Sequence, residues 1–163
     1  MSTYDMLHKY SKEASQIVRF VYFRSLPRAE QELPPMKNKL SGLGDVGRGF
    51  YDALRGIYTA AKDRDLSSYF MKLYRHGDPD QISSLSDRFK QDAYRSTTDE
   101  YERGYLIAWE IAMKTLSDLK REYPDYPMKD EPQQSKVEKA EEQSDFDVQP
   151  RKKPKAKERD RSG

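Results

Sequence analysis

The sequence contains no cysteine, and this absence excludes disulfide bonds, thiolate metal sites and a cysteine nucleophile. It also lacks any run of about eighteen apolar residues, so we expect no membrane-spanning helix. The N-terminus has neither the basic start nor the apolar stretch of a secretory signal. These absences together favour a cytoplasmic or nuclear protein without a membrane partner.

Histidine is scarce as well. His8 and His76 are the only two, and neither lies in an H-x-x-x-H or H-E-x-x-H spacing. We therefore expect no metal site and no cofactor. Ser117–Lys120 spells the S-x-x-K of some acyl-transfer enzymes, but the companion motifs of those enzymes are absent. The sequence disfavours an enzyme, and an enzyme of unfamiliar design stays a third hypothesis.

Apolar residues are few, since 35% of the chain is hydrophobic and 36% is charged. The shortfall is concentrated after residue 122, where closely spaced prolines forbid a continuous helix and few apolar residues follow. We predict a helical domain over 1–122 and a disordered tail over 123–163. The tail is acidic over 129–149 and basic over 151–161.

Helical periodicity is what the first 122 residues do contain. Apolar residues recur there at spacings of three and four, which is typical of one buried helix face. Five such segments predict an all-α fold, a compact bundle of about five amphipathic helices. The predicted faces are Leu7, Tyr10, Ala14, Ile17 and Val21; Val46, Phe50, Leu54, Ile57 and Ala61; Leu66, Tyr69, Phe70 and Leu73; Ile82, Leu85, Phe89 and Ala93; and Tyr105, Trp109, Ala112, Leu116 and Leu119.

Residues that begin and end helices support this division. Gly77 is expected to end the third helix in a left-handed conformation. Asp78 as N-cap with Pro79 at the first helical position begins the fourth. Thr97 as N-cap, with Glu100 three residues later, has the spacing of a capping box and predicts the start of the fifth.

One segment spells a dinucleotide-binding motif. Gly42, Gly44 and Gly47 stand in the order G-x-G-x-x-G, but such a site needs a buried strand before the glycines. The preceding "ELPPMKNKLS" is no apolar strand. We interpret the glycines as a flexible loop leading into the second helix, with an anion site at that helix N-terminus as the alternative.

Tyrosine and phenylalanine are frequent, and several of them adjoin arginine. Such pairs can bind phosphate and stack on bases, and they also anchor protein interfaces. The basic run near the C-terminus resembles a nuclear-import signal and could equally bind nucleic acid or only solubilise the chain. The candidate contacts to phosphate or nucleic acid are Arg19, Arg24, Lys37, Lys39, Arg48, Arg75, Arg95, Arg151, Lys152, Lys153 and Lys155.

Phe146 and Val148 form an apolar pair in the acidic part of the tail. Residues at i and i+2 lie on one face of an extended strand, so this pair is a candidate partner motif.

The sequence alone does not determine the function. Its leading hypothesis is a non-enzymatic adaptor or regulatory protein that binds a protein partner, in the style of an accessory protein of a virus or mobile element. The alternative is a nucleic-acid-binding protein that uses the arginines and lysines of the domain and the basic cluster of the tail.

Overall fold

The computed structural model describes residues 3–127, and that part of the chain is helical with no strand. The predicted all-α bundle is confirmed, and the predictions for residues 128–163 lie outside the described residues. The elements are α1 (Thr3–His8), α2 (Ser11–Tyr22), α3 (Leu26–Leu40), the short 3-10 helix η1 (Ser41–Leu43), α4 (Gly44–Lys62), α5 (Tyr69–His76), α6 (Pro79–Ala93) and α7 (Glu100–Glu122).

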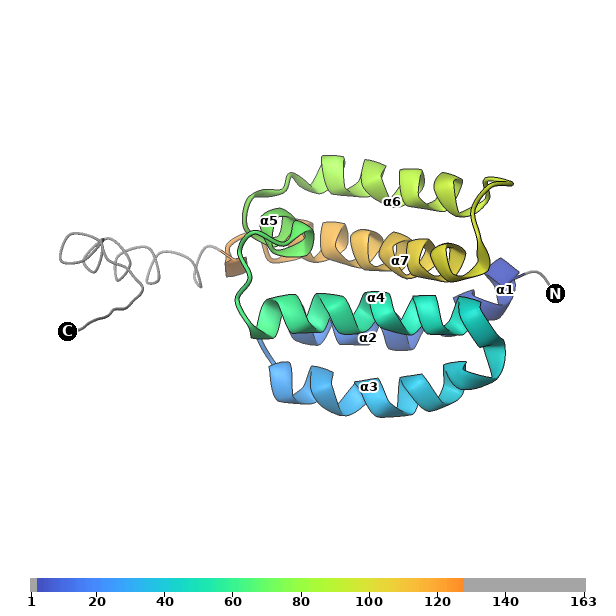
Figure 1. The fold of residues 1–163 in the computed structure, drawn as a ribbon. Coiled ribbons are helices and arrows are strands. Elements are labelled where there is room, and N and C mark those ends of the chain that lie inside the picture. The colour runs from blue at the N-terminus through green and yellow to red at the C-terminus, as the bar shows by residue number, and fades with distance from the viewer. Residues whose placement is uncertain (1–2, 128–163) are drawn as a thin grey trace, which may run out of the picture. The chain divides into compact units, whose positions relative to one another are not determined.

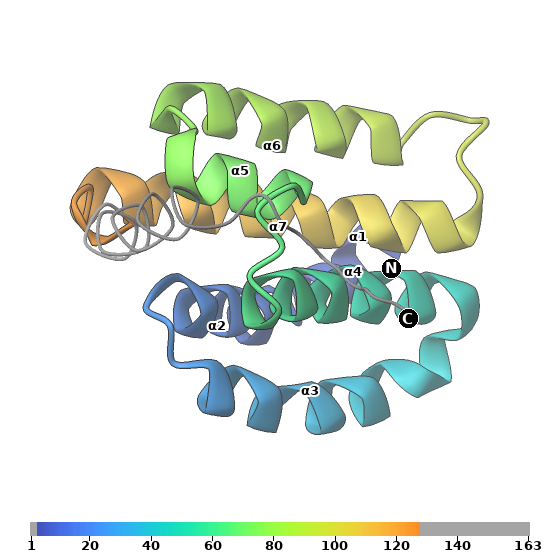
Figure 2. The ribbon, with the colours of Figure 1, turned by 60° about the vertical axis from the view of Figure 1, so that its left-hand side comes forward.

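Helix α7 is the centre of the bundle. It packs against α4, α6 and α2, and it lies between α6 and α4 in both ribbon views (Figures 1 and 2). Because neighbours surround it, its buried residues are not confined to one stripe. Of the predicted face, Leu116 and Leu119 are buried, whereas Tyr105 is 37% exposed.

Helices α4 and α7 approach each other through two glycines, which we call the glycine contact. A Cβ atom on Gly49 would collide with the carbonyl oxygen of Tyr101, and one on Gly104 would collide with that of Val46. The two backbones therefore touch where neither residue has a side chain. This close approach also brings the N-terminal half of α4 against the start of α7.

The bundle has more helices than the periodicity predicted. The first predicted segment is divided into α1 and α2, and α3 was missed because Pro34 and Pro35 lie inside it. Each proline removes one intrahelical hydrogen bond, but both are exposed. Burial of one apolar face offsets the loss. The buried residues of that face are Ala29, Leu33, Met36 and Leu40.

Helix ends agree with the predictions in one case and differ in two. Asp78 accepts hydrogen bonds from two backbone N–H groups in the first turn of α6, as predicted. The predicted N-cap Thr97 is wrong, because Asp99 accepts the hydrogen bond from the Glu102 N–H and α7 begins after it. Gly77 ends α5 with a φ of −71°, so its predicted left-handed conformation is also wrong.

Aromatic residues from distant segments form what we call the tyrosine cluster, Tyr22, Phe23, Tyr74, Tyr123 and Tyr126. The Tyr22 hydroxyl donates to the Tyr123 carbonyl at 2.6 Å, and the Tyr126 hydroxyl donates to the Phe23 carbonyl at 2.9 Å. Tyr123 and Tyr126 were predicted to belong to the tail. They instead belong to the compact unit that ends at Tyr126.

The short helix α5 is fixed to α7 by a lysine. Lys120 is only 8% exposed, and its Nζ donates to the carbonyls of Leu73 and Tyr74 at 3.0 and 2.7 Å. These carbonyls belong to the last turn of α5, where free carbonyl groups and the helix dipole favour a cation. Lys120 thus caps α5 from the interior of the bundle.

Candidate interaction surfaces

The glycine motif serves helix packing. The residues before it form α3, Gly42 lies in η1, and Gly44 begins α4 with a φ of +67°. A Cβ atom on Gly47 would collide with the carbonyl oxygen of Leu40. The interpretation as a flexible loop was therefore wrong, since Gly44 and Gly47 allow a tight connection between two packed helices.

Lys37 and Arg48 do come together, in a cleft of about 660 Å³ between α3 and α4 that Arg55 also lines. We call it the α3–α4 cleft. Asp45 and Asp52 lie in the same cleft, so its three cations face two carboxylates. The result is a surface of mixed charge with a small positive excess.

Most of these charges already have neighbours. Arg48 lies 3.2 Å from Asp45, and its guanidinium is 5.2 Å from the centre of the Tyr101 ring. Asp52 accepts a hydrogen bond of 2.7 Å from the Tyr101 hydroxyl, and this bond raises the pKa of Tyr101. Arg55, by contrast, is exposed and makes no hydrogen bond or ion pair within residues 3–127. The sequence did not single it out.

A second cleft of about 500 Å³ continues along α4, and it shares Asp52 and Arg55 with the first. We call it the Asp63 cleft. It is lined by Asp63 and Asp65 and by the small residue Gly56. The surface formed by the two clefts therefore has more cations at the end with Lys37 and more carboxylates at the end with Asp63 and Asp65.

None of the other predicted cations of the domain lines the α3–α4 cleft. Arg19 has its guanidinium 5.9 Å from the Phe23 ring, Arg24 donates to the Ala61 carbonyl, Lys39 pairs with Glu13, Arg75 lies in the last turn of α5, and Arg95 pairs with Asp92. The candidates Arg151, Lys152, Lys153 and Lys155, like Phe146 and Val148, lie outside the described residues.

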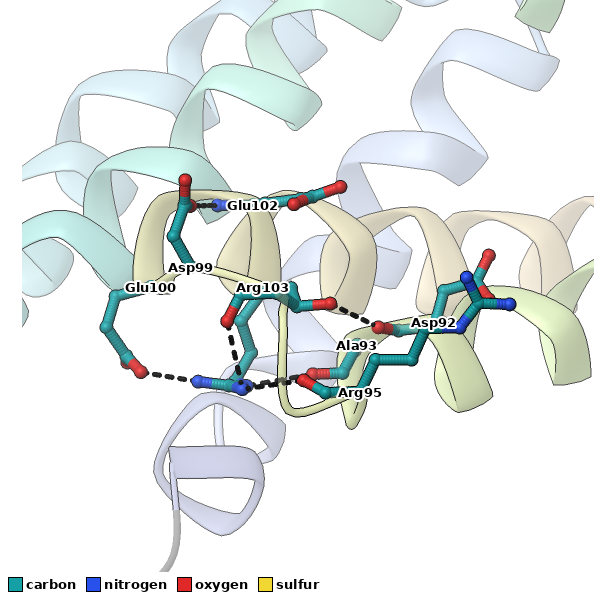
Figure 3. Close-up of polar contacts among 8 residues, drawn as sticks. Asp92, Ala93, Arg95, Asp99, Glu100, Glu102 and Arg103 are labelled. Atoms are coloured by element: carbon teal, nitrogen blue, oxygen red, sulfur yellow. Dashed lines mark hydrogen bonds and ion pairs between the residues drawn. The ribbon is translucent and has the colours of Figure 1, made fainter.

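Arg95 lies in the connection between α6 and α7, which is organised by Arg103 (Figure 3). The Arg103 guanidinium donates to the carbonyls of Ala93 and Thr98 and pairs with Glu100. Arg103 also reaches the carbonyl of Arg95, whose own side chain lies 2.9 Å from Asp92. Arg103 thus holds the connection in place, and Arg95 is already part of an ion pair.

Aromatic side chains from three helices surround a cleft of about 330 Å³, which we call the aromatic cleft. Its residues are Tyr69 from α5, Phe89 from α6, and Tyr105, Leu106 and Trp109 from α7. The ring centres of Tyr69 and Phe89 each lie 5.8 Å from that of Trp109. Tyr69 is 49% exposed, and no charged side chain lines the cleft.

The sequence predicted four members of the aromatic cleft as parts of buried helix faces, missed Leu106 and missed the exposure of the tyrosines: the predicted members are Tyr69, Phe89, Tyr105 and Trp109. Periodicity identifies the face of a helix that turns towards its neighbours. It does not show where that face meets solvent at the edge of a contact. The exposed tyrosines lie at such an edge, where α5, α6 and α7 meet.

His8 meets a carboxylate between α1 and α7. Its Nε2 lies 3.5 Å from Oε1 of Glu110, and the other oxygen of Glu110 accepts a hydrogen bond of 2.9 Å from the Tyr4 hydroxyl. Burial and this hydrogen bond raise the pKa of Tyr4. The cluster fastens α1 to the central helix. Among the described residues, no group of three histidine or carboxylate side chains could hold a metal ion.

In comparisons with known proteins, the chain matches no family model, no curated protein and no solved structure. Within the described part of the chain, none of the helices combines the length and apolar character needed to cross a membrane.

Proposed function

We propose that this protein is a non-enzymatic protein-binding module whose aromatic cleft receives an apolar side chain of a protein partner. The observation that carries the proposal is the exposure of Tyr69 and Tyr105, 49% and 37% respectively, beside Trp109. Tyrosine and tryptophan are enriched among the residues that dominate binding energy at protein interfaces. Their hydroxyl and indole groups can also pair with a partner's polar atoms.

The construction of the cleft supports this role. Trp109 lies on the central helix, and Tyr69 lies on α5, whose last turn is held by Lys120. Aromatic side chains have few rotatable bonds, so a surface built from them loses little conformational entropy when a partner binds. A preformed cleft on packed helices adds to this advantage.

The test is recovery of a partner from the native cell with the tagged full-length chain after crosslinking. Replacing Tyr69→Ser together with Tyr105→Ser removes exposed rings and leaves Trp109 in place. We expect the double variant to keep its circular dichroism and melting temperature while losing the crosslinked partner.

A matched control changes two exposed residues of α6 that lie outside the aromatic cleft, Gln81→Ala with Arg88→Ala. This control should recover the partner as the wild type does. The proposal would be contradicted if the tyrosine variant recovered as much partner as the wild type, or if neither the wild type nor the control variant recovered a partner.

A second candidate function is nucleic-acid binding at the α3–α4 cleft. It is favoured by the grouping of Lys37, Arg48 and Arg55 around Tyr51, which combines cations for phosphate with a ring for stacking. Gel shifts with single- and double-stranded DNA and RNA at two salt concentrations test it. Binding through phosphates predicts an affinity that falls steeply with salt, and no retention at low salt would discard it.

A further inference from the structure

We infer that the exposed face of α4 pairs with the same face of a second copy of this chain, antiparallel and about a two-fold axis. This interface shares no lining residue with the aromatic cleft, although Tyr101 beside Arg48 and Asp52 stacks on Tyr105, and it goes beyond the function proposed above. Two-fold pairing brings one patch against itself, so it requires a self-complementary surface. The charges of α4 provide one.

The order of charges along α4 carries the inference. Asp45, Arg48, Asp52 and Arg55 follow spacings of three, four and three, so they share one helix face and alternate in sign. An antiparallel pairing centred at the level of Phe50 places Asp45 opposite Arg55 of the second copy. The same operation places Arg48 opposite Asp52. All four resulting contacts join opposite charges.

A parallel arrangement of the same two helices is disfavoured. Parallel pairing in register would bring each charge against the same charge of the second copy, which is repulsive. The clefts add a second level of complementarity. The end that carries Lys37 would face the end that carries Asp63 and Asp65.

Two further features of α4 fit an interface with a second copy. Arg55 makes no ion pair or hydrogen bond within residues 3–127. Gly56 is exposed in the middle of the helix, and a Cβ atom there would meet nothing within 4 Å. Glycine in a helix interior lowers helix stability. At an interface, its bare backbone lets the second helix approach closely.

Sedimentation velocity of the full-length chain over a range of concentrations tests the inference at low and at physiological salt. We expect a dimer whose dissociation constant rises with salt, because charge pairs at a surface are screened. Arg55→Asp alone, or Asp45→Arg alone, sets like charges opposite each other twice, so each should raise the dissociation constant at least about tenfold.

The charge-swapped variant D45R/R55D restores opposite charges across the two-fold axis. Its dissociation constant should return to within about threefold of the wild-type value. Neither a general defect in folding nor a simple loss of charge would produce this recovery. Failure of the swapped variant to recover would overturn the inference.

Gly56→Gln offers an uncharged test, since its side chain would block the approach of the second helix. It should be monomeric. At a concentration where the wild type is also monomeric, it should be no less stable to heat, because nothing surrounds that position in one chain. Ser84→Gln on the exposed side of α6 is the matched control and should still dimerise. A Gly56→Gln dimer as tight as the wild type would contradict a close helix pair.

The outcomes separate this inference from the proposed function. Arg55→Asp should lose the dimer and keep the crosslinked partner, whereas the Tyr69 and Tyr105 double variant should do the reverse. A wild-type chain that stays monomeric at low salt overturns the dimer and leaves the aromatic cleft untouched. A further result would overturn the inferred dimer. In that case the monomeric chain binds an oligonucleotide at the α3–α4 cleft, and Arg55→Asp abolishes this binding.

Discussion

The glycine contact and the tyrosine cluster both join segments that are distant in the sequence, and they do so by opposite means. At Gly49 and Gly104, two helices touch because side chains are missing. In the tyrosine cluster, hydroxyls of Tyr22 and Tyr126 reach carbonyls across the fold. The first contact depends on shape alone. The second depends on hydrogen bonds and therefore on the protonation of the phenols.

The largest effect is expected from Gly104→Ala. A methyl group there collides with the backbone of α4 rather than with a flexible side chain, so the two helices must separate. Such overpacking should lower the free energy of unfolding by about 3 kcal/mol or more. Urea denaturation followed by circular dichroism measures it. A loss below about 1 kcal/mol would show that the helices move apart easily.

Removing the C-terminal part of the tyrosine cluster should have a smaller effect. A chain that ends at Glu122 loses the rings and hydrogen bonds of Tyr123 and Tyr126, and we expect it to be about 2 kcal/mol less stable. A chain that ends at Tyr126 keeps those contacts and serves as the control. If both chains unfold at the same urea concentration, the cluster does not stabilise the fold.

The tyrosine cluster should also weaken at alkaline pH, whereas the glycine contact should not. Burial raises the pKa of Tyr22 to about 12, from 10.0 in the unfolded chain. The stability that depends on its neutral phenol is fully present below pH 10 and is lost as the pH rises towards 12. The unfolding midpoint in urea should fall over this range. Tyr22→Phe should be less stable at neutral pH but should show a weaker pH dependence.

The smallest effect is expected from Gly42→Ala, because Gly42 differs from the other glycines of the sequence motif. A Cβ atom at Gly42 meets nothing within 4 Å, and no left-handed conformation is required there. The free energy of unfolding should stay within about 0.5 kcal/mol of the wild type. A large loss would contradict the open surroundings of Gly42.

The fold was predictable in α4, where one side of the helix stays exposed and the other is buried. All five residues of the stripe from Val46 to Ala61 are buried as the spacing predicted. It was not predictable in α3, where Pro34 and Pro35 are tolerated on the exposed side because the other side is buried. The prediction of buried residues was also incomplete for α7, which three helices surround.

The candidate surfaces were less predictable than the fold. The sequence identified Lys37 and Arg48, which do share a cleft, but missed Arg55 beside them. It also gave no sign of the aromatic cleft. Pairing between distant helices decides which residues of a stripe remain at the solvent edge, and a local pattern contains no such information.

Lys120, which is buried, caps the helix that carries the exposed Tyr69. Eight residues are too few for a helix to persist in isolation, so the position of Tyr69 depends on what secures the opposite end of its helix. Under the function proposed above, replacing Lys120 with methionine would therefore alter affinity at the aromatic cleft, which the lysine side chain does not line. Variants that change such binding need not lie in the cleft itself.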